Sequence, residues 1–332
     1  MKLRGKIEIV ATLLMALVLS AGCQRRPLDE ASDGLYLNLN LNLEVKNLDK
    51  GIAKPELMRV LFYDAESLEF VSDDYVLPDG GYINALPGKY KMVVYNFDTE
   101  RTRIRGDRGV VELEAYTNDI PNATRTNLLT KLRASTKADF VAPSSTERIV
   151  YEPDHFLVAR EDVEILHRTG TQELHATASS IVESYYLGVS LQNSKYIASA
   201  QALLSGQAES NKFGFEGGMS KNSVILYFDM KAGVNEKYGT EVLQTTFNTF
   251  GKLPNEESRL WLTIVVTTTT GEIITWQDDI TDKFVDNKDK YIYLEEDPNN
   301  PIVVPVPPPS SEGGGFQPEV DEWDTIYEDI II

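Results

Sequence analysis

One segment of this sequence alternates apolar and polar residues with a strict period of two. Between residues 35 and 45, every odd position is leucine or valine, and the even positions hold tyrosine, asparagine or glutamate. Because successive side chains of a β-strand point to opposite faces, the pattern predicts a long strand with one buried face. Such a face needs a second layer to cover it, which favours a sheet packed on a sheet.

Further strand signals follow along the chain. Short apolar or β-branched runs between Gly, Pro and Asp turns predict strands at residues 58–63, 75–77, 82–85, 90–97, 110–116, 148–152, 156–159 and 163–166. A second series predicts strands within 172–191 and at 223–230, 259–270 and 273–277. Residues 241–250 suit a helix or a strand, and their threonine content favours the strand.

These segments predict an all-β protein made of two tandem β-sandwich domains with one short helical connection. We place the N-terminal β-sandwich domain at residues 35–168 and the C-terminal one at 172–297, with an exposed joint between them. The helical connection is predicted at 123–133, where leucines gather on one side.

The charge and the cysteine content narrow the range of functions. The formal net charge is −19, so nucleic acid is not an expected partner, because phosphate binding needs a basic face. Cys23 is the only cysteine in the sequence. Stability must therefore come from burial rather than from disulfides.

The N-terminus has the layout of an export signal. Basic residues precede an apolar run at 9–19 that is too short to span a bilayer. Ala21-Gly22-Cys23 resembles a bacterial lipobox, and the resemblance implies cleavage before Cys23 and its acylation with fatty acids such as palmitate. We expect a signal peptide at 1–22 and a lipidated tether at 23–34. The alternative is a soluble secreted protein with a chance cysteine.

The composition of the C-terminal part changes at residue 298 and again at residue 316. Residues 298–315 are rich in Pro and Gly and predict a linker. Residues 316–332 predict a C-terminal strand whose large apolar side chains include Trp323, Ile326, Ile330 and Ile332. Disordered tails rarely carry so many such residues. Two interpretations remain open: the strand packs back on its own domain, or it is offered to another chain by strand pairing.

The sequence carries no recognisable catalytic or metal-binding pattern, so we predict a non-enzymatic protein without a cofactor or a metal. The histidines are His155, His167 and His175, and they lack the helical spacing of a zinc site. Cys23 would be capped by lipid and could not serve as a nucleophile.

Two other features are candidate binding elements. Arg105-Gly106-Asp107 lies in a polar loop and could present a cation and a carboxylate to an integrin-like host receptor, although the glycine serves a turn equally well. Trp261, Trp276 and Trp323 could form a sugar-stacking platform. Trp261 lies in an apolar run, however, and is expected in the core.

Several short motifs occur together with Cys23, at residues 59–64, 86–90, 93–97, 247–251 and 313–323. In this combination the sequence resembles the fimbrillin-associated anchor lipoproteins of Bacteroidales type V pili. The resemblance implies two transthyretin-like (Greek-key) β-sandwich domains, an outer-membrane location facing the cell surface, and pilin (fimbrillin) subunits as partners. Residues 316–332 resemble the exchangeable strand of the pilins, and the resemblance assigns no catalytic residue.

The predicted function is therefore that of a non-enzymatic outer-membrane lipoprotein, which anchors or assembles a pilus (fimbria) at the cell surface through β-strand pairing with pilin subunits. The alternative is a surface glycan-binding lipoprotein of a polysaccharide-uptake system. That alternative needs exposed aromatic rings with asparagine or aspartate side chains nearby.

Overall fold

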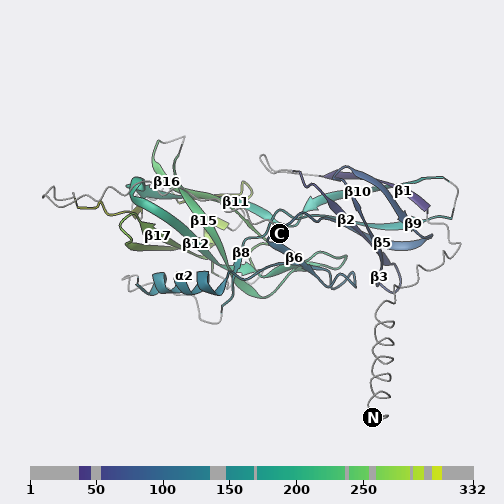
Figure 1. Cartoon of the computed structure of the whole chain (residues 1–332), viewed down its shortest axis with the longest axis horizontal. Helices are drawn as coiled ribbons and strands as arrows, with labels where there is room; N and C mark the ends of the chain where they lie inside the picture. The colour runs from purple at the N-terminus through teal and green to yellow at the C-terminus, as the bar shows by residue number, and fades with distance from the viewer. Residues whose placement is uncertain are drawn as a thin grey trace, which may run out of the picture.

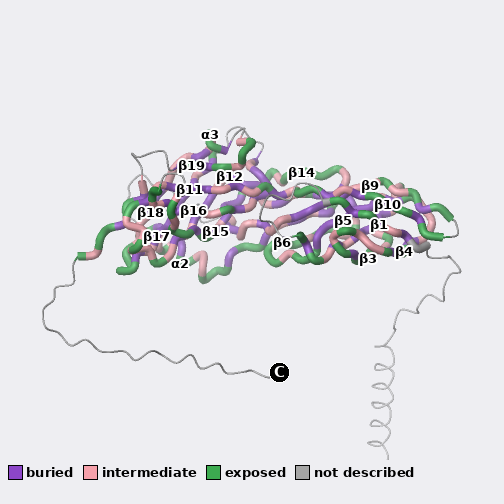
Figure 2. Tube along the Cα trace, turned by 90° about the horizontal axis from the view of Figure 1, so that it is seen from above, coloured by how far each residue is buried: buried purple, intermediate pink, exposed green. Residues whose placement is uncertain are grey.

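The computed structural model describes residues 37–45, 54–134, 147–167, 170–235, 239–253, 259–284, 287–294 and 301–308. Regular structure in this part of the chain is almost all β-strand. Figures 1 and 2 show an elongated molecule with a sheet-rich body at each end. The prediction of an all-β fold with sandwich-like bodies is confirmed.

The first body is a seven-stranded sheet with the strand order β3-β2-β5-β9-β10-β1-β4. Its strands are β1 (Leu37–Val45), β2 (Met58–Asp64), β3 (Phe70–Val76), β4 (Gly80–Ala85), β5 (Gly88–Asn96), β9 (Leu157–Ile165) and β10 (Gln172–Ser180). Residues 172–178 of β10 pair with β1, and residues 179–180 pair with β9. The sheet therefore folds over along β10 into two layers with a common core.

Strand β1 behaves as the alternation predicts. Leu39, Leu41 and Leu43 are buried and pack with side chains of β2 and β5 in the opposite layer. β1 runs parallel to β10 on one side and antiparallel to β4 on the other. The leucine face thus closes the first core, because it forms one of that core's two layers together with buried residues of β4 and β10.

The second body is larger and again has two layers. Its strands are β8 (Ile149–Tyr151), β11 (Glu183–Gln192), β12 (Ile197–Ala208), β15 (Ser223–Val234), β16 (Glu241–Thr249), β17 (Trp261–Thr268), β18 (Ile273–Asp279), β19 (Tyr291–Leu294) and β20 (Ile302–Val303). The main path is β18-β17-β12-β15-β16-β11-β19, with β8 on β15 and β20 on β11. The ambiguous residues 241–250 form β16, as favoured from the threonine content.

In the described residues, three short helical segments accompany the strands: α2 (Asn122–Ala134), α3 (Thr281–Phe284) and the 3-10 turn η1 (Ser194–Tyr196). The predicted helix at 123–133 is confirmed as α2. Its buried Leu128 and Leu132 pack with Leu203 and Val265, so α2 covers the outer face of the second body (Figure 1). No helix in the described part of the chain is long and apolar enough to cross a membrane.

Strand pairing does not follow the predicted domain boundary at 168–172. β10 lies in the first sheet although 172–180 was assigned to the second domain, and β8 and α2 lie against the second body although they precede residue 168. The physical reason is that periodicity identifies a strand but not its partner. Parallel pairing of β10 with β1 joins residues far apart in the sequence, which local patterns do not reveal.

The first part of the segment predicted as a linker, residues 298–315, contains a strand in the structure. β20 pairs in parallel with the end of β11, through Leu191↔Ile302 and Gln192↔Val303. Ile302 and Val304 are buried in the second core. These apolar residues between prolines gain more from burial than from solvation, so the segment joins the sheet at its edge.

Leu41→Ala is expected to destabilise the protein by about 2 to 5 kcal/mol, because it removes a side chain that is only 1% exposed and leaves a cavity between the layers. Glu44→Ala on the exposed face of β1 is the matched control and should change stability by less than about 0.5 kcal/mol. Urea unfolding followed by circular dichroism measures both. Equal effects would contradict the assigned inward face of β1.

Candidate functional site

The two bodies meet at a small sheet built from both halves of the chain. It contains β6 (Thr102–Arg105), β7 (Glu114–Thr117), β13 (Ser210–Lys212) and β14 (Gly218–Met219), in the order β14-β13-β7-β6. β7 and β13 are antiparallel, with Ser210 opposite Tyr116 and Lys212 opposite Glu114. Ser210 Oγ also donates a hydrogen bond to Glu114. The junction is therefore held by main-chain pairing as well as by side chains.

A buried aromatic cluster lies under this small sheet. Phe213, which follows β13, packs against Tyr95 and Phe156 of the first body with ring centroids 5.3 and 5.0 Å away. All three side chains are fully buried. Their shared core also takes in Val182, Ala208 and Phe250, so it draws on both halves of the chain.

The backbone around Phe213 is closely packed. A Cβ atom at Gly214 would lie 1.7 Å from the carbonyl oxygen of Val110, so only glycine fits there. Arg160 Nε donates to the Phe213 carbonyl at 2.8 Å, and burial lowers the pKa of Arg160. These contacts fix the backbone that carries the Phe213 side chain. Sequence reasoning missed this site; the signal that could have found it is Phe213-Gly-Phe215 directly after a polar strand.

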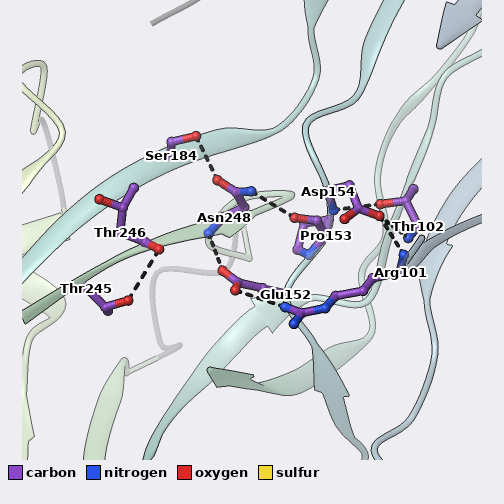
Figure 3. Close-up of polar contacts among 9 residues, drawn as sticks. All are labelled: Arg101, Thr102, Glu152, Pro153, Asp154, Ser184, Thr245, Thr246 and Asn248. Atoms are coloured by element: carbon purple, nitrogen blue, oxygen red, sulfur yellow. Dashed lines mark hydrogen bonds and ion pairs between the residues drawn. The ribbon is translucent and has the colours of Figure 1, made fainter. Parts of the chain in front are cut away.

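A polar network reinforces the junction on one side, as Figure 3 shows. Glu152, between β8 and β9, accepts hydrogen bonds from Arg101 Nη1 at 3.1 Å and from the backbone N–H of Asn248 at 3.0 Å. Asn248 Nδ2 donates to the Pro153 carbonyl, and Ser184 Oγ donates to Asn248 Oδ1. The network therefore links β11 and β16 of the second body to loops of the first.

Burial raises the pKa of the Glu152 carboxyl, and the Asn248 N–H and the Arg101 guanidinium only partly offset that effect. The side chain is 20% exposed and forms an ion pair with Arg101. A charge placed here costs desolvation energy, so the contact fixes geometry at some expense of stability.

A cleft of about 340 Å³ lies beside this network. Its lining residues are Lys54, Pro55, Asn96, Asp98, Thr99, Glu100, Asp154, His155, Leu157 and Asn248. Asp98 accepts a hydrogen bond from the Glu56 N–H, and Asp154 accepts from the N–H groups of Arg101 and Thr102 at 2.6 and 2.8 Å. These two carboxylates therefore stabilise the loops around the cleft by accepting hydrogen bonds from backbone N–H groups. The described residues contain no group of three or more His, Cys, Asp or Glu placed to hold a metal ion.

The Arg105-Gly106-Asp107 tripeptide lies where β6 ends. Arg105 forms an ion pair with Glu114 at 2.6 Å, and Asp107 lies 3.5 Å from Arg59. Gly106 has a φ of +72°, and an added Cβ would approach the Glu112 carbonyl oxygen to 2.2 Å. Both charged groups thus have partners within the chain, and the glycine is required by the turn. This geometry favours the turn interpretation over receptor binding.

The other predicted site residues do not gather into one place. Trp276 is buried, whereas Trp261, which was expected in the core, is only partly buried. The partial exposure arises because Trp261 is the first residue of β17, at the end of its strand. Cys23, Trp323, Ile326, Ile330 and Ile332 lie outside the described residues, as do the predicted signal peptide, tether and C-terminal strand.

The fold and the joint describe a two-body β-sandwich protein. The chain belongs to the family described as "Domain of unknown function (DUF5119)", which matches residues 25–229. The resemblance to fimbrial anchor proteins is confirmed by comparison with known proteins.

One similar protein is the "Putative fimbrium anchoring subunit Fim4B" of Bacteroides ovatus, with 26% identity over 227 residues. The match covers 68% of this chain and 61% of that protein. The crystal structure of a "putative adhesin" from the same species has 24% identity and a TM-score of 0.57, and the match covers 86% of this chain and 94% of that one. The fimbrial anchor protein Mfa2 of Porphyromonas gingivalis has 13% identity and a TM-score of 0.42, with 78% and 87% covered.

Glu152→Gln tests the electrostatic cost at the junction. Because the folded-state pKa of Glu152 lies above its ordinary value of 4.5, the folded protein holds this proton more tightly than the unfolded chain does. The parent should therefore lose stability relative to Glu152→Gln as the pH rises from about 4.5, until the folded carboxyl is ionised.

Denaturant unfolding of both proteins at several pH values measures this difference. Asp162→Asn, which removes an exposed carboxylate paired with Lys91, is the control, because an exposed ion pair contributes little to stability. If the parent instead gained stability relative to Glu152→Gln as the pH rises, the pKa of Glu152 would be lowered in the folded protein, and the prediction would be wrong.

Proposed function

We propose that this protein is a non-enzymatic outer-membrane lipoprotein that is attached through Cys23 and anchors a fimbrium at the cell surface. The similarity to a fimbrium anchoring subunit supports a pilus-associated role at the cell envelope. The lipobox-like sequence at Cys23 supports attachment by lipid.

The observation that carries the proposal is a continuous path between the ends of the described chain. β1 pairs in parallel with β10, and β10 leads through two residues into β11. β11 in turn pairs in parallel with β19 and β20. One stretch of chain, residues 172–192, thus pairs with β1 in the first body and with β19 and β20 in the second.

This pairing suits a protein under tension. A pull on the N-terminal end of β1 runs along its hydrogen-bonded partner β10, so the bonds of the pair share the load in shear instead of opening one by one. The same holds for β20 on β11 when the C-terminal side is pulled. Between the two pairs, the junction core prevents the bodies from separating.

We further propose that residues 316–332 form the strand that pairs with fimbrial subunits. β20 brings the chain along the edge of the second body before this segment, with Ile302 and Val304 buried. In the isolated protein the segment binds its own second body, and it is exchanged during assembly.

Cys23→Ala is expected to abolish membrane attachment while the protein still folds, because the residue precedes every described strand. Detergent phase partitioning and membrane fractionation of the mutant and the parent measure attachment, and circular dichroism measures folding. Retention of the mutant in the detergent phase would exclude the lipid anchor.

Deletion of residues 316–332 tests the proposed strand. If the segment binds in cis, the thermal midpoint of the purified protein should fall by several degrees, because lost burial and pairing act directly on its stability. Cells carrying the truncated protein should also release their fimbriae into the medium. Unchanged stability together with normal cell-bound fimbriae would remove any role of this segment.

A further inference from the structure

The outward face of β1 has an unusual composition for a strand. Its even positions 40 and 42 are both asparagine, a residue that is depleted in strands because its short amide competes for backbone hydrogen bonds. Burial does not explain this choice, since Asn42 is exposed and Asn40 only partly buried. A solvent-facing strand position usually takes threonine at lower cost.

The asparagine side chains are held in place by one carboxylate. Asn40 Nδ2 and Asn42 Nδ2 donate to the same oxygen, Glu173 Oε2, at 2.9 and 2.8 Å. An asparagine amide has two N–H donors and one carbonyl oxygen, so each keeps one donor and its acceptor after this bond. The amides therefore present paired donor and acceptor groups in a fixed orientation, which lowers the entropy cost of binding.

An exposed aromatic ring lies next to these amides. Tyr82 on β4 stands opposite Asn40 and is 75% exposed, the largest exposed fraction of any large apolar side chain in the described residues. Gly80, two positions earlier on the same face, stands opposite Asn42 and has no side chain. The ring is thus open on the side of Asn42. The turn requires glycine at this position, since its φ is +101°.

These side chains lie in two neighbouring rows that cross three adjacent strands. Tyr82, Asn40 and Glu173 are aligned across β4, β1 and β10, and Asn42 is aligned with His175 in the next row. Neighbouring strands lie about 4.8 Å apart, so the three strands span about 10 Å. We name this surface the amide face; its members are Asn40, Asn42, Tyr82, Asn84, Glu173 and His175, in the first body (Figure 1).

The charges of the amide face select the class of ligand. Glu173 is the acid among its members, and the exposed Glu44 follows Asn42 on the same face of β1. One oxygen of the Glu173 carboxylate is already held by two amides. The chain as a whole has a net charge of −19, which repels anionic polymers such as uronic acid chains and lipopolysaccharide. The face itself offers neutral amides, which complement an uncharged partner rich in hydroxyl groups.

We propose that the amide face binds a soluble, uncharged oligosaccharide. Tyr82 stacks on the apolar face of one sugar ring, and the Asn40 and Asn42 amides form paired hydrogen bonds with neighbouring hydroxyl groups. The site does not depend on lipid attachment or on the proposed pairing of residues 316–332 with fimbrial subunits. It lies in the first body, whereas β19 and β20 lie in the second.

A purely structural role for the asparagines would be to fix β1 against β10. The two bonds to Glu173 fit such a role, but it needs neither the exposed ring of Tyr82 nor its position opposite Asn40. A variant of Tyr82 therefore separates the two roles. Since the side chain is mostly exposed, its removal leaves the core intact.

Isothermal titration of the full chain in detergent tests the proposal, with maltohexaose, mannohexaose and xylohexaose as neutral probes. At least one of these should bind at millimolar concentration or below. Tyr82→Ala should weaken that binding by at least about tenfold, and Tyr82→Phe, which keeps the ring, by less than about threefold. Asn42→Ala should also weaken it. Thermal midpoints of the Tyr82 variants should match the parent.

Tyr291→Ala is the control, because Tyr291 is 51% exposed on the second body and should not affect binding. Oligogalacturonate and lipopolysaccharide micelles are the anionic probes and should bind more weakly than the best neutral probe. The proposal is overturned if no neutral probe binds, if Tyr82→Ala binds like the parent, or if an anionic probe binds more tightly.

Discussion

The packing of Phe213 against Tyr95 and Phe156 is the contact on which the arrangement of the two bodies depends. The side chain comes from the second half of the chain, yet its partners belong to the first body. Removing apolar surface of this size from water is worth several kcal/mol, and aromatic edge contacts add to it. Together with the pairing of β7 and β13, this burial makes the junction a core of its own instead of a flexible hinge.

The polar side of the junction obeys a different constraint. Glu152 is partly withdrawn from water, so its charge is tolerated only because Arg101 and the Asn248 N–H face it. Such a contact adds little stability, but it has a defined geometry that an apolar contact lacks. The apolar cluster therefore supplies the cohesion between the bodies, and the polar network supplies their orientation. A joint of this kind resists both separation and rotation of the two bodies.

The sequence predicted the strands far better than their partners. Alternation at 35–45, most β-branched runs and the leucines of α2 are local signals, and they produced elements close to those observed. The predicted strand at 110–116 begins only at Glu114, and β12 was not predicted. Strand pairing is set by the global fold. The parallel contact between β1 and β10, the crossing of β8 into the second body and the burial of Ile302 all depend on residues far apart in sequence. For the same reason the junction escaped prediction, because Phe213 and Glu152 gain their importance from partners far away in the sequence, such as Tyr95 and Asn248.

The alternation in β1 has consequences for both of its faces. A slip of one residue against β4 or β10 would move Asn40 and Asn42 into the core and expose the leucines, which the energetics of buried amides forbids. Register is therefore fixed on both sides of β1, and with it the positions of Tyr82 and Glu173 relative to the asparagines. The buried leucines thus determine the geometry of the exposed polar face. A binding surface built in this way needs no loop to order itself, because the hydrophobic core has already aligned its side chains.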